Sequence, residues 1–128
     1  MPRFFSIAAA ALIALGLAVP DESVRGEEAS QFFARKVRPL LETKCFDCHS
    51  AKAEDVKSGL KLDTLDDILR GGAMGPIVIP GDPENSFLLK ALRYEESDYQ
   101  MPPAGRVSDE EIAAVEQWIR QLSSTTSK

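Results

Sequence analysis

Apolar positions recur at intervals of three and four residues in several stretches of this chain, which is the period of an amphipathic α-helix. Ser30 is a preferred N-cap residue type, so we expect it to start a helix that runs to Cys45 with an interruption at Pro39. Near the other end, residues 108–111 (Ser-Asp-Glu-Glu) form a capping box that predicts the start of the last helix. The apolar stripes of these two helices are Phe33, Val37, Leu40 and Leu41, and Ile112, Val115, Trp118, Ile119 and Leu122.

Two shorter helices are expected between these ends. The first follows a cap at Asp63 or Thr64, and the second starts at the N-cap and proline pair Asp82-Pro83 and continues through Tyr94. The apolar run between them, residues 75–81, is bracketed by glycine and proline, which indicates an ordered loop rather than a strand. Because no stretch predicts a sheet, the pattern favours an all-α fold, a small helical bundle with long ordered loops.

The amino-terminal segment has the pattern of a secretory signal peptide. Arg3 gives it a positive end, and the uncharged run 7–19 is shorter than the roughly 20 residues that cross a bilayer. Small residues before Ala18 favour cleavage there, and residues 24–26 offer a second cleavage position; a buried or uncleaved amphipathic helix is the alternative. We therefore expect a signal peptide at residues 1–18, a flexible lead at residues 19–29, one folded domain at residues 30–122 and a frayed end at residues 123–128.

The net charge of the chain indicates which classes of partner it can bind. The 128 residues include 15 Lys and Arg against 20 Asp and Glu, a formal net charge of −5. Such a chain is not expected to bind nucleic acid through backbone phosphates, nor to favour an anionic membrane surface. If charge steers its encounters, the partner should present a basic contact face.

The strongest chemical signal is the run Cys45-Phe46-Asp47-Cys48-His49, the C-x-x-C-H attachment pattern of a c-type haem. Its two cysteines and its histidine are the only ones in the sequence. Thiols three positions apart on a helical turn are expected to face the same way, so that Cys45 and Cys48 both add to one porphyrin. His49 would then present its imidazole to the iron. Such attachment takes place outside the cytoplasmic membrane in bacteria, which agrees with an export signal.

Cysteine and histidine at this spacing have three other known uses: a redox dithiol, a structural zinc site and a disulfide. A thioredoxin-like dithiol needs a strand-to-helix setting that the pattern does not show. A structural zinc site needs four ligands, usually in two separated pairs. A disulfide between Cys45 and Cys48 would close a very short loop and add little stability. The motif therefore favours one covalently attached haem c.

The order of several short segments resembles a class I cytochrome c and, more narrowly, the planctomycete-type cytochrome c domain. The resemblance covers residues 32–121 and implies a small cytochrome c-like helical bundle around one covalently bound haem. It also implies that the closing helix packs Trp118 and Ile119 against Phe33 and Val37. The segments that carry it are residues 37–41, Cys45–His49, residues 59–63 (Gly-Leu-Lys-Leu-Asp), residues 75–83, Met101-Pro102-Pro103 and Trp118-Ile119.

The sixth iron ligand is predicted to be Met101. With His49 as the only histidine, two imidazoles cannot come from this chain, and Pro102 and Pro103 stiffen the backbone around the Met101 sulfur. The resemblance points to the same residue. Met74 lies between glycines and is expected to be a haem-crevice contact or partly exposed.

One further role is assigned by the resemblance alone. It implies that a proline carbonyl on the histidine side orients the imidazole; Pro76 is the candidate, with a plain turn proline as the alternative. Tyr94, Tyr99 and Arg106 are candidates for hydrogen bonds to the haem propionates.

Histidine and methionine ligation raises the potential of a haem and leaves no open position for a substrate. The sequence therefore predicts a periplasmic or otherwise exported monohaem electron carrier rather than an enzyme, without stable membrane insertion after signal cleavage. It would meet redox proteins in transient complexes or as a subunit of a larger assembly. The alternatives are a haem-based sensor or peroxidase-like protein with a labile sixth ligand, and a non-haem zinc or dithiol interaction module.

Overall fold

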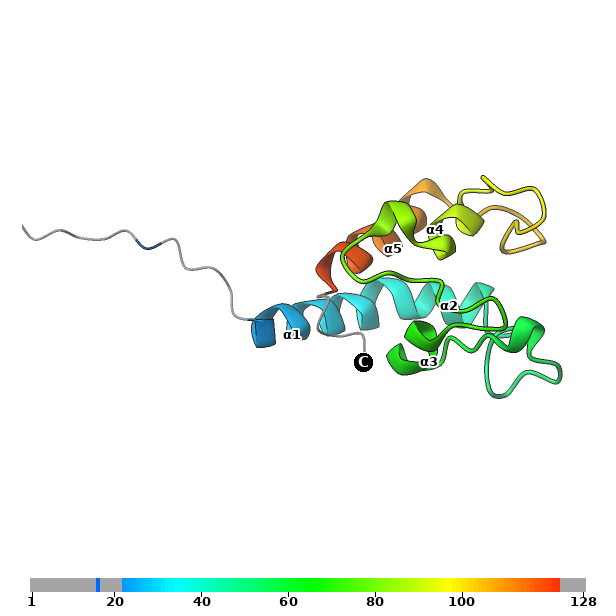
Figure 1. Ribbon diagram of the computed structural model, residues 1–128, viewed down its shortest axis with the longest axis horizontal. Helices are drawn as coiled ribbons and strands as arrows, with labels where there is room; N and C mark the ends of the chain where they lie inside the picture. Colours follow the sequence, from blue (N-terminus) through cyan, green and yellow to red (C-terminus); the bar gives the residue numbers. More distant parts are fainter. Residues whose placement is uncertain (1–15, 17–21, 123–128) are drawn as a thin grey trace, which may run out of the picture.

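The computed structural model describes residue 16 and residues 22–122, and within this part the chain is helical (Figure 1). Between Glu22 and Leu122 it forms no strand, only an isolated bridge between Gly72 and Gly75. The all-α prediction is confirmed. The elements are α1 (Glu22–Phe32), η1 (Phe33–Val37, π-helical), α2 (Arg38–Lys44), η2 (Lys57–Gly59, 3₁₀), α3 (Leu65–Arg70), η3 (Pro83–Asn85, 3₁₀), α4 (Phe87–Leu92) and α5 (Asp109–Gln121).

The first helix differs from its prediction at its start. Ser30 is not an N-cap, because α1 already begins at Glu22, and the expected flexible lead is wrong for residues 22–29. The sequence did not predict this helix because residues 22–32 show no apolar stripe. Within the helix, Ala29 is buried in the core at 4% exposure. Contact with α5 stabilises α1. The proposed signal peptide and the expected frayed end at 123–128 lie outside the described residues, apart from Gly16.

The predicted interruption at Pro39 takes the form of a wider helical turn. Segments α1, η1 and α2 follow one another without a gap, and η1 ends at Val37, two residues before the proline. Proline lacks the N–H donor and crowds the carbonyl of the preceding turn, so the ordinary hydrogen-bond ladder cannot run through it. In the π-turn the Arg38 N–H donates to the Phe33 carbonyl instead.

The core is formed where α5 crosses the α1–α2 run. Trp118 is 1% exposed and packs on Phe33, with ring centroids 5.0 Å apart and planes tilted by 43°. Val37 and Ile119 are fully buried beside them, and α5 contacts η1, so the expected packing of the closing helix is confirmed. The capping box at the start of α5 is also present.

The middle of the chain departs from the prediction at Ser86. A single helix from Pro83 was expected, but η3 and α4 are separate elements with extended backbone at Ser86. The Ser86 side chain is fully buried, donates to the Asp82 carbonyl (2.8 Å) and accepts from the Ile79 N–H (2.9 Å). The hydroxyl thus occupies the Asp82 carbonyl, which would accept the Ser86 N–H in a continuous helix.

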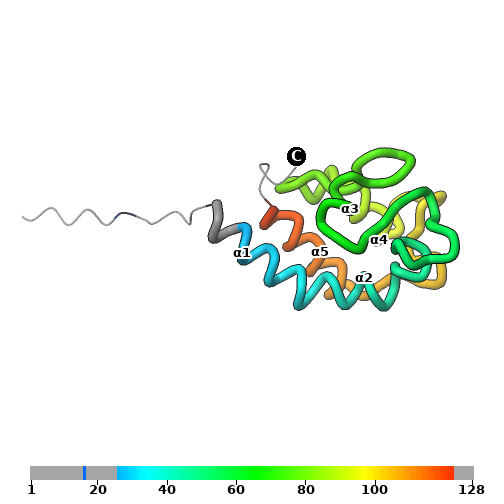
Figure 2. Tube along the Cα trace, turned by 90° about the horizontal axis from the view of Figure 1, so that it is seen from below, coloured from blue at the N-terminus to red at the C-terminus, as the bar shows by residue number. Residues whose placement is uncertain are grey.

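Two long loops lie at the same end of the molecule. Figures 1 and 2 both show that the loop after α2 and the loop between α4 and α5 lie at the end opposite the start of α1. The motif residues Cys45–His49 are on the first of these loops, and Met101 is on the second. No helix of residues 22–122 is long and apolar enough to cross a membrane.

Candidate functional site

The residues that carry chemistry gather around one cavity of about 230 Å³. It lies between the loop after α2, the segment 72–77 and α4. Of the predicted site residues, Cys45, His49, Met101 and Pro76 line it, and Cys48 does not. Among the described residues that line it, none is Asp, Glu, Lys or Arg. The other lining residues are Ser58, Leu60, Leu62, Gly72, Ala73, Met74, Gly75, Ile77, Phe87, Leu88, Ala91, Leu92 and Tyr99.

The motif forms one tight turn directly after α2. The N–H groups of Cys48 and His49 both donate to the Cys45 carbonyl, at 3.2 Å and 2.9 Å. Residues four apart differ by about 40° around a helix and residues three apart by about 60° on the other side. Cys45 and His49 face the cavity, whereas Cys48 is exposed and lines a separate surface hollow with Asp47. The expectation that both thiols face the same way is therefore wrong for this structure.

The two thiols are free and differ in their surroundings. Burial raises the pKa of the Cys45 thiol to about 11, and Coulombic repulsion from Cys48 and Glu111 adds to the shift. Cys45 is therefore a neutral thiol at pH 7. A dithiol redox site works through a cysteine whose pKa is lowered. The surroundings of Cys45 do the reverse, which disfavours the thioredoxin-like alternative.

His49 is held by two hydrogen bonds to the backbone of a segment that follows the motif. Its Nδ1 lies 3.2 Å from the Leu60 carbonyl oxygen, and its own carbonyl accepts from the Leu62 N–H at 2.9 Å. A carbonyl can only accept, so Nδ1 carries the proton and Nε2 keeps its lone pair. This tautomer leaves Nε2 as the nitrogen that can bind a metal.

The carbonyl that contacts the His49 imidazole in this structure is that of Leu60, whereas Pro76, the predicted residue, lines the cavity. Leu60 belongs to the segment Gly59–Asp63, one of the segments that carry the family resemblance. The alternation of apolar and polar residues in this segment is typical of extended backbone, which can lie along the motif. This alternation was the signal that could have identified the segment as the partner of His49.

The Asp63 carboxylate joins the segment Gly59–Asp63 to the residues that follow His49. Asp63 accepts from the Ser50 hydroxyl at 2.7 Å and from the Ala51 N–H at 2.9 Å. Burial alone would raise the pKa of the Asp63 carboxyl, but these hydrogen bonds outweigh it and lower the pKa below its ordinary value. Asp63 thus fixes the chain immediately after His49 to the segment that contacts the imidazole.

A glycine loop packs against the same segment. The Ala73 N–H donates to the Ser58 carbonyl at 2.7 Å, and a Cβ added at Gly72 would lie 2.6 Å from that oxygen. Gly72 is therefore required by the close approach of two backbones. The neighbouring Met74 lines the cavity and is 62% exposed, which agrees with its expected place at the edge of a crevice.

Met101 comes to the cavity from the loop between α4 and α5. Its N–H donates to the Ala91 carbonyl at 3.2 Å, and the Met101–Pro102 peptide is cis. The Tyr94 hydroxyl donates to the Pro102 carbonyl, so in this structure it is not directed to a propionate as expected. Arg106, another of the three candidates for the propionates, pairs with Asp109 at 2.8 Å.

The donor set and the lining fit a haem. The cavity combines a thiol, an imidazole with a free Nε2 and a thioether, and the last two are axial ligands of haem iron in cytochromes c. Its walls are mostly apolar, as the faces of a porphyrin require. Across residues 22–122 no three His, Cys, Asp or Glu side chains cluster in a way that could hold a metal ion.

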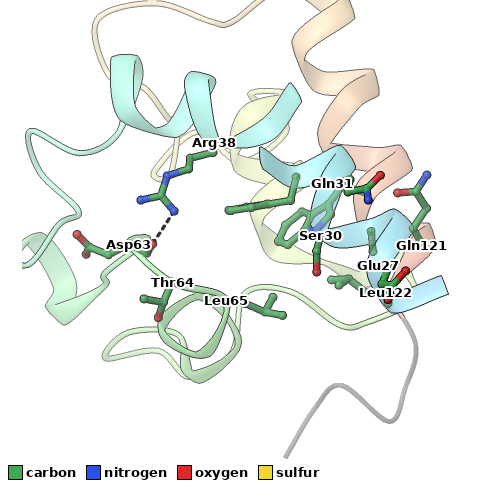
Figure 3. Close-up of a pocket in the computed structure, with 13 residues that line it drawn as sticks. Glu27, Ser30, Gln31, Arg38, Asp63, Thr64, Leu65, Gln121 and Leu122 are labelled. Atoms are coloured by element: carbon green, nitrogen blue, oxygen red, sulfur yellow. Dashed lines mark hydrogen bonds between the residues drawn. The ribbon is translucent and has the colours of Figure 1, made fainter. Parts of the chain in front are cut away.

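A larger hollow of about 710 Å³ lies between α1, the start of α3 and the end of α5 (Figure 3). Phe33, Leu65 and Trp118 are among its lining residues, and the Arg38 guanidinium donates to the Asp63 carbonyl at 3.5 Å at its edge. None of the predicted site residues lines it. The smaller cavity is therefore the functional candidate.

Comparison with known proteins agrees with this choice. Residues 45–105 match the model of the family described as Planctomycete cytochrome C. The matched segment begins at Cys45, contains the Gly59–Asp63 strip and ends just after Met101-Pro102-Pro103. No curated protein and no solved structure gives a significant match to the chain.

Proposed function

We propose that this chain is a haem-binding c-type cytochrome that carries single electrons between redox partners with one haem. The match of residues 45–105 to the planctomycete cytochrome c family supports this assignment. The observation that carries the proposal is the single cavity onto which Cys45, His49 and Met101 converge from two distant segments. One attachment motif and one histidine in the sequence support a single haem.

The roles of the chain's residues follow from their chemistry. Cys45 and Cys48 would hold the haem through thioethers, which requires Cys48 to turn from its exposed position toward the cavity. His49 would bind through Nε2, and its contact with Leu60 sets the ring orientation and strengthens the nitrogen as a donor. Met101 would supply the sixth ligand. When bound, the haem iron supplies a one-electron couple whose potential the axial ligands tune.

A filled coordination sphere favours a carrier over an enzyme. The Met101 backbone is tied to α4, so its sulfur is held at the cavity instead of swinging freely in solvent. A thioether held there would keep small molecules from the iron. A sensor or peroxidase-like protein would need that position to open readily, which is the outcome that the test below distinguishes.

The partner would present a basic rim around an apolar centre. Met74 and Tyr99 line the cavity and are 62% and 39% exposed, and Glu95, Glu96 and Asp98 are exposed directly before Tyr99. The net charge of −5 has the same sign. Complementary charge speeds encounters between proteins. We infer transient docking of redox proteins over this mouth.

Export completes the proposal. It rests on the charge and length pattern of residues 1–19. Cytochrome c domains are typically exported, which supports the same location.

The test compares the two cavity methionines in haem-loaded protein matured in a bacterial periplasm. Mass analysis should show one covalently added haem. Met101→Ala should lower the potential and let carbon monoxide bind the ferrous protein rapidly, while Met74→Ala, the matched loss of a thioether in the same cavity, should keep slow binding. Rapid binding by the unchanged protein would indicate the open-site alternative, and absence of covalent haem would overturn the cytochrome assignment.

A further inference from the structure

The loop that carries Met101 is fastened to α4 at three points. The Tyr99 ring packs edge-on against Phe87, with centroids 5.3 Å apart and planes at 77°. The Met101 N–H donates to the Ala91 carbonyl at 3.2 Å. The contacts follow the same order along the loop and along the helix, and the third lies just beyond the helix end.

That third contact is the hydrogen bond from the Tyr94 hydroxyl to the Pro102 carbonyl. Pro102 directly follows Met101, so the methionine is tied on its own N–H and on the next carbonyl. The remainder of the loop up to α5 has no regular structure. In the described part of the chain, the Tyr94 hydroxyl makes the only side-chain hydrogen bond to residues 99–103.

Tyr94 holds this position in an uncommon backbone conformation. Its φ is +59°, in the left-handed region, where a bulky aromatic residue is a genuine outlier. Glycine or asparagine would fit the end of α4 more easily. A strained conformation that persists is typical of functional sites.

The backbone on which Tyr94 sits is fixed from several sides. The guanidinium of Arg93 lies 3.7 Å from a carboxylate oxygen of Glu84, 3.9 Å from one of Glu95 and 3.3 Å from one of Glu116. These carboxylates come from η3, the following loop and α5, and the Arg93 side chain is only 21% exposed. The hydroxyl of Tyr94 is thus anchored to the core of the bundle, and through it so is Pro102.

We propose that Tyr94 is a positioning residue that keeps the Met101 sulfur at the haem iron by holding the carbonyl of Pro102. This inference rests on the proposed function, in which Met101 is the sixth ligand. Loss of the hydroxyl would leave the methionine able to dissociate more often, without removing the ligand itself. Exchange of the sixth ligand would then become faster.

The experiment measures cyanide binding to the ferric holoprotein at saturating cyanide, where the rate is limited by departure of the native ligand. Tyr94→Phe keeps the ring and removes the hydroxyl. Tyr94→Asn also removes it, but suits a positive φ and should preserve or raise the thermal stability. Thr64→Ala removes the cap of α3, away from the loop, and serves as a destabilised control.

Both Tyr94 variants should bind cyanide about tenfold faster than the unchanged protein, with Thr64→Ala at the unchanged rate. Unchanged rates in the Tyr94 variants, or equal acceleration in Thr64→Ala, would overturn the inference. Met101→Ala distinguishes a failure of the positioning role of Tyr94 from a failure of the proposed function. If it too exchanges at the original rate, then Met101 is not the ligand and the proposed function fails with it; if only Tyr94→Phe and Tyr94→Asn are unaffected, the positioning role alone is wrong.

Discussion

The imidazole of His49 is oriented by the backbone carbonyl of Leu60, with Nδ1 and the oxygen 3.2 Å apart. A second backbone bond, from the Leu62 N–H to the His49 carbonyl, runs in the opposite sense. Orientation by a backbone group leaves the side chain at position 60 free to line the cavity.

Gly72→Ala should destabilise the protein by about 1–3 kcal/mol, because the new methyl group overpacks a backbone contact. The added Cβ would lie 2.6 Å from the Ser58 carbonyl oxygen, two residues before Leu60. The forced shift should also change the reduction potential through His49. Chemical denaturation and potentiometry measure the two effects. Gly26→Ala is the control, since Gly26 lies in α1 with open space around it and alanine favours a helix; a loss of stability there would contradict the packing argument.

Asp63→Asn should remove stability that depends on pH. The pKa of Asp63 is lowered in the folded protein, so its carboxylate stabilises the fold above its unfolded pKa of about 3.9, and this contribution is lost as the pH falls through the folded pKa. The unchanged protein should therefore exceed the variant in stability near pH 7, and the difference should shrink below about pH 4. Thermal unfolding across this range provides the measurement. A difference that stays constant with pH would show that the carboxylate charge is unimportant.

Ser86→Ala should cost about 1–3 kcal/mol, since it removes a fully buried hydroxyl that accepts from the Ile79 N–H and donates to the Asp82 carbonyl. Ser97→Ala removes the same hydroxyl from an exposed position and should stay within about 0.5 kcal/mol of the unchanged protein. Denaturant unfolding compares them. Equal stability of the two variants would argue against the role of Ser86 in separating η3 from α4.

The acidic residues before Tyr99 should speed reaction with a cationic electron donor. We expect the double variant Glu96→Gln and Asp98→Asn to lower the rate of reduction by hexaammineruthenium(II) about two- to fivefold at low salt, and the effect should vanish at high salt. Stopped-flow reduction measures it. Glu54→Gln with Asp66→Asn changes the net charge equally at exposed positions elsewhere in the chain. The same loss of rate in this control would mean that total charge, not the cavity mouth, governs the encounter.

Local chemistry made much of the site readable without coordinates. The C-x-x-C-H motif and the Met-Pro-Pro turn are recognised by residue types and spacing, so Cys45, His49 and Met101 could be predicted to share a site before the cavity that they line was known. The cap and apolar stripe of α5 were equally readable, because capping and helical period are properties of neighbouring residues.

Contacts between distant segments could not be read in the same way. Every residue has a carbonyl, so residue identity does not tell which one meets His49; that depends on how the strip Gly59–Asp63 lies against the motif. Helix α1 formed against α5 without an apolar stripe of its own, and the Ser86 hydroxyl, by its bond to the Asp82 carbonyl, interrupts a helix whose local signals favoured continuity. The loop that carries Met101 is likewise held to the end of α4 by the Tyr94 hydroxyl, a contact between distant segments that side-chain periodicity does not predict.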